Sequence, residues 1–169
     1  MFEMIEDNEI PDLQAIANEV NASGKNWKAN PNSHFNDMTR SDMQKTLGTI
    51  VDPDWLVKTG GIRDYVGATI PTEFNSNTQW PECESVINNI RDQSDCGSCW
   101  AFGSTEALND RICVHSNGAF TEYLSTSDTT GCCNGTECFS FGCGGGQPGL
   151  AWGWFTRTGV VTGSGFGDG

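Results

Sequence analysis

The chain has 169 residues, enough for one domain or for a small domain with an attached segment. It carries 22 Asp and Glu against 9 Lys and Arg, a formal net charge of −13. Nucleic acids and anionic membranes are bound by clustered Lys and Arg, so this charge argues against both as partners. No apolar run is long enough to span a membrane.

The N-terminal third is predicted to hold two helices and a linker. The first helix covers residues 10–22, where apolar residues recur at helical spacing. A second, shorter helix is predicted over residues 39–47, with Thr39 as its cap and Gly48 closing it. Residues 49–69 are predicted to be extended, because proline and paired glycines interrupt them.

The helix that carries the chemistry is predicted to begin near Cys99. Ser98 is a good N-cap, and the helical pattern runs to Val114 before the turn pair Asn117-Gly118. The unpaired N–H groups of a first turn and the positive end of the helix dipole favour a negatively charged sulfur. A nucleophilic cysteine needs that form.

The remainder is predicted to be poor in regular structure. Residues 119–127 are polar and irregular, and residues 131–149 form a loop rich in cysteine and glycine. Residues 151–155 are predicted to be helical, with both tryptophans packed in a core. Residues 159–163 are predicted to form a short strand.

The cysteines indicate an oxidising compartment. All eight lie between Cys83 and Cys143, which favours disulfides. Glycosylation sequons at Asn21 and Asn134 agree with a secretory route. Residues 1–9 have no basic start and no apolar run of a signal peptide, so we expect the true N-terminus to lie outside this sequence.

Residues 96–100, Cys-Gly-Ser-Cys-Trp, are identical to a signature of papain and cathepsin nucleophiles. Roughly residues 70–169 resemble the first part of a mature cathepsin B-type cysteine peptidase. The matching stretches are residues 79–83, 90–93, 110–113, 132–133, 142–146 and 151–152. The resemblance implies an α+β papain-like fold, of which this chain holds mainly the helical left half, with the β-rich right half largely missing.

The same resemblance implies a zymogen. Residues 10–50 are similar to the short propeptide of this family, which lies in the cleft in the reverse direction to a substrate and blocks it. An ordinary helical extension remains the alternative. Residues 1–9 would then be an N-terminal remnant, residues 51–69 a linker and activation region, and residues 70–169 the N-terminal part of the peptidase domain.

Roles for individual residues follow from the resemblance. Cys99 would be the nucleophile, and the Gln93 amide would belong to the oxyanion hole. Gly145, Gly146 and Trp100 would contact the substrate. The chemistry is attack of a thiolate on a peptide carbonyl through an acyl-enzyme, with no cofactor and no metal.

The resemblance also implies how the cysteines pair. The implied disulfides are Cys83–Cys113, Cys96–Cys143 and Cys133–Cys138. Cys99 would stay free, and Cys132 would be unpaired here, because its partner in the family lies beyond position 169. Two alternatives have weak support: a redox pair of Cys96 with Cys99, and a zinc site formed by Cys132, Cys133, Cys138 and Cys143.

The chemistry also needs a histidine and an asparagine to orient it. His34 lies in the propeptide-like region, and His115 lies about 24 Å along the helix from Cys99 by helical rise, so neither can be the base. We therefore expect this chain alone to be inactive, as part of an endopeptidase or exopeptidase of cathepsin B type. The alternative is a truncated, non-catalytic homologue that binds or inhibits peptidases.

Partners and location follow from the family. The expected partners are peptide and protein substrates, the protein's own propeptide, and protein inhibitors of thiol proteases. The expected location is an acidic compartment of lysosomal type, or the outside of the cell, reached by the secretory pathway.

Overall fold

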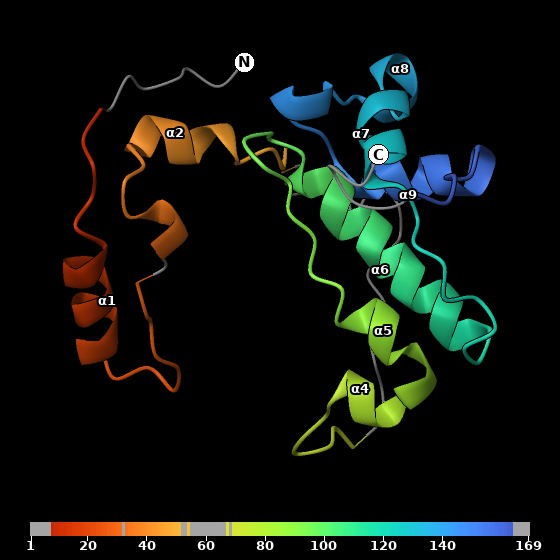
Figure 1. Ribbon diagram of the computed structural model, residues 1–169, viewed down its shortest axis with the longest axis horizontal. Helices are drawn as coiled ribbons and strands as arrows, with labels where there is room; N and C mark the ends of the chain where they lie inside the picture. Colours follow the sequence, from red (N-terminus) through yellow and green to blue (C-terminus); the bar gives the residue numbers. More distant parts are fainter. Residues whose placement is uncertain (1–7, 32, 52–53, 55–66, 68, 164–169) are drawn as a thin grey trace. The chain divides into compact units, whose positions relative to one another are not determined.

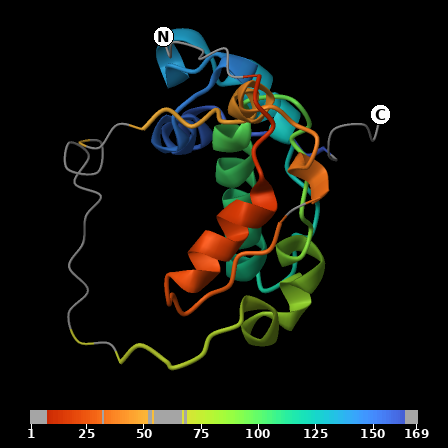
Figure 2. The same cartoon turned by 90° about the vertical axis from the view of Figure 1, so that its left-hand side faces the viewer.

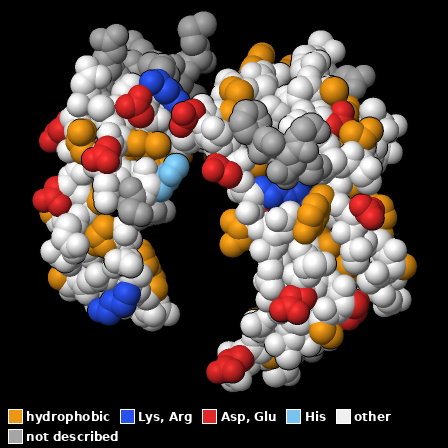
Figure 3. Space-filling view, viewed as in Figure 1, with side chains coloured by type: hydrophobic (Ala, Val, Ile, Leu, Met, Phe, Trp, Pro, Cys, Tyr) orange, Lys and Arg blue, Asp and Glu red, His pale blue; other side chains and the backbone are white. Residues whose placement is uncertain are grey.

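The computed structural model describes residues 8–31, 33–51, 54, 67 and 69–163. It divides the chain into two compact units, residues 1–47 (unit 1) and residues 48–169 (unit 2). Most of the predicted linker, the first seven residues and the last six lie outside the described part. In Figure 3 acidic side chains are spread over both units, in agreement with the net charge of −13.

Unit 1 is built from short helices. They are α1 (Leu13–Ala22), the 3-10 helix η1 (Ser33–Phe35) and α2 (Arg40–Lys45). The Asp12 side chain caps α1 by accepting from the Ala15 N–H, and the Thr39 hydroxyl caps α2 by accepting from the Asp42 N–H. Both predicted helices are present and shorter than expected, since α2 ends at Lys45, before Gly48.

Unit 2 is organised around the longest helix, α6 (Cys99–His115). Helices α7 and α9 pack on it, and α5 contacts it nearer its C-terminal end (Figures 1 and 2). The elements besides α6 are α4 (Ser76–Gln79), η2 (Pro81–Cys83), α5 (Glu84–Ile87), α7 (Thr126–Cys132), α8 (Gly135–Cys138), η3 (Gly142–Gly144) and α9 (Pro148–Arg157).

Two hydrophobic clusters hold α6 in place. The larger one packs Trp100 and Ala101 of α6 against Ala151, Trp154 and Phe155 of α9. The smaller one joins the Cys83–Cys113 disulfide to Val86 of α5. Trp154 is 3% exposed, and Trp152 packs against the larger cluster, so both tryptophans contribute to the core as predicted.

Pairing between extended segments is limited to two isolated bridges in the described residues. The predicted strand at residues 159–163 is reduced to a bridge between Leu124 and Thr162, because only residues 123–125 pair with it. Helices α7 and α8 form where the sequence predicted irregular chain and loop. No helix in the described part of the chain is long and apolar enough to span a membrane.

Candidate active site

Cys99 is the first residue of α6, as predicted. The preceding loop turns sharply at Ser94, whose φ is 51° and whose N–H donates to the Asp92 carboxylate at 2.8 Å. Ser98 occupies the N-cap position, but its hydroxyl makes no cap hydrogen bond. The Cys99 thiol is half-buried and forms no disulfide, so a reduced sulfur stands at the start of a helix.

Residues 48–51, here called the covering segment, lie over Cys99. The Gly48 N–H donates to Cys99 Sγ at 3.2 Å, and Thr49 Oγ1 lies 3.2 Å from the same sulfur. Gly48 therefore presents an N–H donor to the sulfur. A thiolate attacks a carbonyl carbon, so this contact covers the sulfur without offering it a substrate.

Gly146 holds the covering segment by two backbone hydrogen bonds. Its N–H donates to the Gly48 carbonyl oxygen, and its carbonyl accepts from the Ile50 N–H, both at 2.8 Å. These two bonds flank Thr49 and form a parallel bridge between Thr49 and Gly146. The backbone of Gly146 thus pairs with an extended segment of the same chain.

The absence of side chains makes this close approach possible. A Cβ atom on Gly48 would overlap the Gly97 carbonyl oxygen, and one on Gly145 would lie 2.9 Å from the Gly48 oxygen. On Gly146 a Cβ would lie 2.5 Å from Trp100 Cδ2. The covering segment and the floor beneath it therefore require glycine at all three positions.

Gln93 lies in the loop that precedes α6. Its amide Nε2 donates to the Cys96 carbonyl oxygen at 2.8 Å, which anchors the side chain within the loop that leads to Cys99. The side chain also lines a cavity of about 440 Å³ beside the Cys96–Cys143 disulfide, together with Phe102 of α6 and Thr130 of α7.

Trp100 has a different role from the one expected. Its side chain is fully buried, and its indole Nε1 donates to the Gly142 carbonyl oxygen at 3.1 Å. A buried indole cannot contact a substrate directly, so the prediction that Trp100 binds substrate is wrong in this structure. Trp100 instead supports Gly146 from below.

Three disulfides pin the loops around α6. Cys96–Cys143 joins the nucleophile loop to the glycine loop, Cys133–Cys138 spans α8, and Cys83–Cys113 anchors the far end of α6. These are the pairs that the resemblance implies. Because Cys96 is bonded to Cys143, Cys96 and Cys99 do not form a redox pair here.

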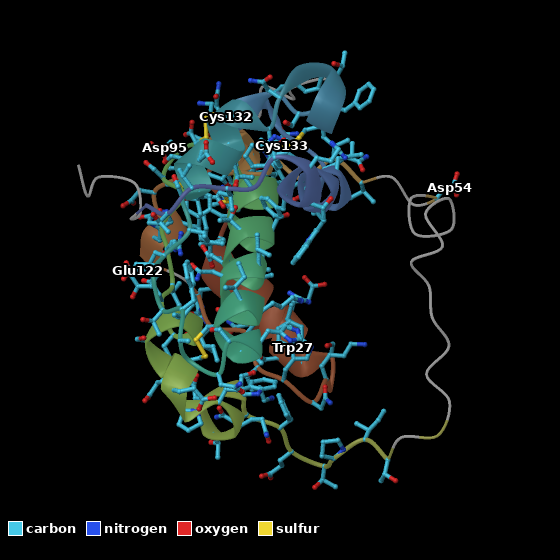
Figure 4. All side chains as sticks on the ribbon, turned by 90° about the vertical axis from the view of Figure 1, so that its right-hand side faces the viewer. Trp27, Asp54, Asp95, Glu122, Cys132 and Cys133 are labelled. Carbon is cyan, nitrogen blue, oxygen red and sulfur yellow. A yellow bond between two sulfur atoms is a disulfide. The ribbon has the colours of Figure 1, made fainter. Side chains whose placement is uncertain are left out.

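Cys132 is the other free thiol in the described residues, and it is exposed. Figure 4 shows it beside Cys133 at the end of α7. A hydrogen bond with the Asp128 carboxylate raises the pKa of the Cys132 thiol.

Among the residues that the structure describes, no group of three or more His, Cys, Asp or Glu side chains could hold a metal ion, which gives the zinc alternative no support.

A half-buried charged cluster lies along α6. Burial raises the pKa of Glu106 and of Asp110, and the nearby Arg91 opposes the shift in both. Arg91 donates to the Leu124 carbonyl and to the Asn109 side chain, and Cζ of its planar guanidinium lies 5.2 Å from the Tyr123 ring centroid. These carboxylates are therefore more readily protonated than exposed ones.

Neither histidine is placed as a catalytic partner of Cys99 within unit 2. His115 is the last residue of α6, so it lies at the opposite end of that helix from Cys99. His34 lies in η1 of unit 1. Within unit 2 no imidazole is therefore placed beside the sulfur, as far as the described residues go.

The two sequons differ in their surroundings. The Asn21 amide exchanges two hydrogen bonds with the backbone of Ala29, at 2.9 and 2.8 Å, and is partly buried. The Asn134 side chain is exposed and donates to the Gly131 carbonyl oxygen.

Sequence reasoning missed the residues that contact the sulfur. The sequence predicts that Gly48 closes a helix and that residues 10–50 form the segment that blocks the cleft, but it gives Gly48 and Thr49 no individual role at the sulfur. Part of the signal is Gly48 itself, because glycine is common just past the end of a helix. The contact itself joins residues 51 positions apart, so local patterns could not reveal it.

Comparisons with known proteins agree with this geometry. A family model described as papain family cysteine protease matches residues 70–166. Cathepsin B-like cysteine proteinase 5 of Caenorhabditis elegans is 40% identical over 156 residues, covering 90% of this chain and 43% of the relative. Cathepsin B-like cysteine proteinase 4 of the same species is 41% identical over 155 residues, covering 90% and 44%. The chain thus spans less than half the length of these curated relatives.

Solved structures show the same likeness. The procathepsin B named S9 from Trypanosoma congolense matches with a TM-score of 0.70 at 27% identity, over 88% of this chain and 50% of that one. A digestive procathepsin L2 from Tenebrio molitor matches with a TM-score of 0.63 at 19% identity, over 89% of this chain and 47% of that one, which bears on the fold alone. The predicted fold class is confirmed: unit 2 corresponds to the helical half of the papain-like fold.

Proposed function

Since the chain belongs to the papain family of cysteine proteases, we propose that it is the propeptide and nucleophile-bearing part of a cathepsin B-like zymogen. The mature protein would hydrolyse peptide bonds with Cys99. The observation that carries the proposal is the covering segment, because Gly48 and Thr49 contact Cys99 Sγ while Gly146 binds their backbone.

The covering segment would inhibit the peptidase because its chain runs through the cleft in the opposite direction to a substrate. It pairs in parallel with Gly146, whereas the resemblance implies that a substrate runs the opposite way. In the reversed orientation an N–H group meets the sulfur where a substrate would bring a carbonyl carbon. The segment would therefore occupy the cleft without being cleaved, until cleavage in the 60–70 region releases it.

The released site would work by nucleophilic attack. Cys99 would attack the carbonyl carbon and form an acyl-enzyme, which water then hydrolyses. The negative oxygen formed on attack would be bound by the Gln93 side-chain amide and the Cys99 backbone N–H. Gly145 and Gly146 would hold the substrate backbone, as Gly146 holds the covering segment here.

A histidine and an asparagine are still required, and we propose that sequence outside residues 1–169 supplies them. The support is that His115 lies at the far end of α6 from Cys99. Residues 1–169 alone would then not hydrolyse peptides. The balance of endopeptidase and exopeptidase activity would depend on those further residues.

The remaining expectations are also proposals. The three disulfides support passage through an oxidising compartment, either to an acidic organelle of lysosomal type or to the outside of the cell. The exposed Asn134 would be the more accessible glycan acceptor of the two sequons. Protein inhibitors of thiol proteases would compete for the same cleft as the covering segment.

The test is peptide hydrolysis by the processed protein expressed with its full precursor sequence. Cys99→Ser should lower kcat/KM for a fluorogenic peptide by about 10³-fold or more. Gly103→Ala, on the same helix with open space around it, is the matched control and should retain activity. Equal activity of the Cys99→Ser variant and the wild type would overturn the proposal.

A non-catalytic inhibitory module is the second candidate. The same contacts of the covering segment support it, because residues 48–50 lie against the Cys99 sulfur and the Gly146 backbone. Added in trans to an active cathepsin B-type peptidase, residues 1–169 would inhibit under this candidate. No inhibition, combined with hydrolysis by the processed precursor, would remove it.

A further inference from the structure

Ser94, in the loop before α6, has a backbone conformation that does not suit its side chain. Its φ is +51°, in the left-handed region, where a Cβ atom crowds the neighbouring backbone. Glycine takes this conformation freely, because it has no Cβ atom. The loop therefore needs a contact that keeps Ser94 in it. Backbone strain of this kind is concentrated at functional sites.

Asp92 supplies that contact, here called the clasp. Its carboxylate Oδ1 accepts from the Ser94 N–H at 2.8 Å, a turn in which a side chain bonds to the backbone two residues on. The clasp spans Gln93 and so restrains the backbone on both sides of it. Asp92 is exposed, so its carboxylate is not needed for packing in the core.

The other end of the loop is held at Cys96. The Cys96 carbonyl oxygen accepts from the Ser98 N–H at 2.7 Å and from Gln93 Nε2 at 2.8 Å. The disulfide to Cys143 also fixes Cys96. The tip of the Gln93 side chain is thus tied to a pinned point of the loop, whereas the backbone that carries this side chain is restrained by the clasp.

We propose that Asp92 is a positioning residue: by holding Ser94 in the left-handed conformation, it sets the point from which the Gln93 amide reaches the negative oxygen formed on attack. The inference rests on the proposed function. Asp92 itself would touch neither the substrate nor the sulfur. Its effect would fall on the transition state, because the negative oxygen exists only once attack begins, and a displaced donor stabilises that oxygen less.

The test is steady-state hydrolysis of a fluorogenic peptide by the processed protein from its full precursor. Asp92→Ala should lower kcat about tenfold and leave KM within about twofold of wild type, because only transition-state binding is lost. Asp92→Asn keeps an oxygen that can accept from the Ser94 N–H, so its kcat should stay within about threefold of wild type. Adding Ser94→Gly to Asp92→Ala should restore most of the lost kcat, because glycine adopts the left-handed conformation without the clasp.

Asp95→Ala is the matched control, because it removes another exposed carboxylate from the same loop, labelled in Figure 4. It should keep the wild-type kcat and KM. If urea titration shows that Asp92→Ala is not folded, Ser94→Val takes its place. That variant disfavours the same conformation while the carboxylate is intact, so its kcat should also fall about tenfold.

Two results would overturn the positioning role alone. One is a kcat equal to wild type in Asp92→Ala, or in Ser94→Val where it replaces that variant. The other is a loss in Asp92→Ala that Ser94→Gly does not restore, because Asp92 would then act by a route other than the Ser94 backbone. Absence of hydrolysis by wild type would overturn the proposed function, and the positioning role with it.

Discussion

Asn109 shows how much of unit 2 depends on one buried side chain. It is 1% exposed, and its Oδ1 accepts from the Leu124 N–H at 2.9 Å and from Arg91 Nη2 at 3.0 Å. Its Nδ2 donates to the Glu122 carbonyl oxygen at 2.9 Å. The amide therefore fixes the 122–124 segment and the Arg91 guanidinium to the middle of α6.

Asn109→Ala should lower the free energy of unfolding by roughly 2–4 kcal/mol, because it leaves buried donors and an acceptor without partners. Urea unfolding of the 169-residue chain measures the change. Gln79→Ala, which removes an exposed amide at the end of α4, is the control. A loss below about 0.5 kcal/mol for Asn109→Ala would contradict the role assigned to it.

At Gly146 the surrounding side chains leave no room for a Cβ atom. Its missing side chain leaves room for Trp100 Cδ2 and Ser140 Cβ, which would lie 2.5 and 2.7 Å from a Cβ atom. We expect Gly146→Ala to lower the free energy of unfolding by about 1–3 kcal/mol through overpacking. Gly131→Ala has no atom within 4 Å of the added carbon and serves as the control in the same urea titration. Similar unfolding midpoints for the two variants would count against tight packing at Gly146.

At the scale of elements, α6 combines three tasks. Its first residue is the nucleophile, Trp100 and Ala101 enter the core, and Glu106 and Asp110 form a half-buried acidic face. Partial burial raises the pKa of both carboxyls above their ordinary values of 4.5 and 3.8. The folded state therefore holds these protons more tightly than the unfolded state does.

The sign of the pH dependence follows. A raised folded-state pKa makes the two groups favour folding at low pH, and this contribution is lost as pH rises from about 4 through the folded pKa values. Glu106→Gln and Asp110→Asn should remove that loss and raise Tm at pH 7 by roughly 1–2 °C each, with a smaller effect near pH 4. Thermal unfolding at both pH values, with the exposed Glu73→Gln as control, measures this; an effect larger at pH 4 would contradict it.

The sequence predicted α6 well and the shorter helices poorly, for physical reasons. Helix α6 has a long apolar pattern and clear ends, whereas α7 and α8 are short, polar and rich in Thr, Gly and Cys. They are held by tertiary features: the Ser125 hydroxyl accepts from the Asp128 N–H to cap α7, and the Cys133–Cys138 disulfide spans α8. The sequence signal for the start of α7 is the Ser-x-x-Asp pattern at residues 125–128, which is typical of a capped helix N-terminus.

The candidate site shows the same division. The place of Cys99 at a helix start follows from local sequence. The burial of Trp100 and the contact of Gly48 with Cys99 depend on packing between residues far apart in the sequence. Local sequence patterns carry no information about such packing.

At the scale of the whole molecule, the boundary between the units falls at the covering segment. Leu47 ends unit 1, and Gly48 begins unit 2 with its N–H on Cys99 Sγ. The proposed inhibition therefore depends on a contact made inside unit 2, by residues that the sequence assigned to the propeptide-like segment. Removing that contact should expose the sulfur and leave the core of unit 2 unchanged.

The most direct measurement is the rate at which iodoacetamide alkylates Cys99, with the exposed Cys132 of the same chain as internal reference. In Gly48→Val the added side chain would overlap the Gly97 carbonyl and displace the covering segment. The account predicts that the Cys99 rate rises about tenfold or more while the Cys132 rate stays the same. A Cys99 rate that is equal in the variant and the wild type would contradict the claim that this segment covers the active site.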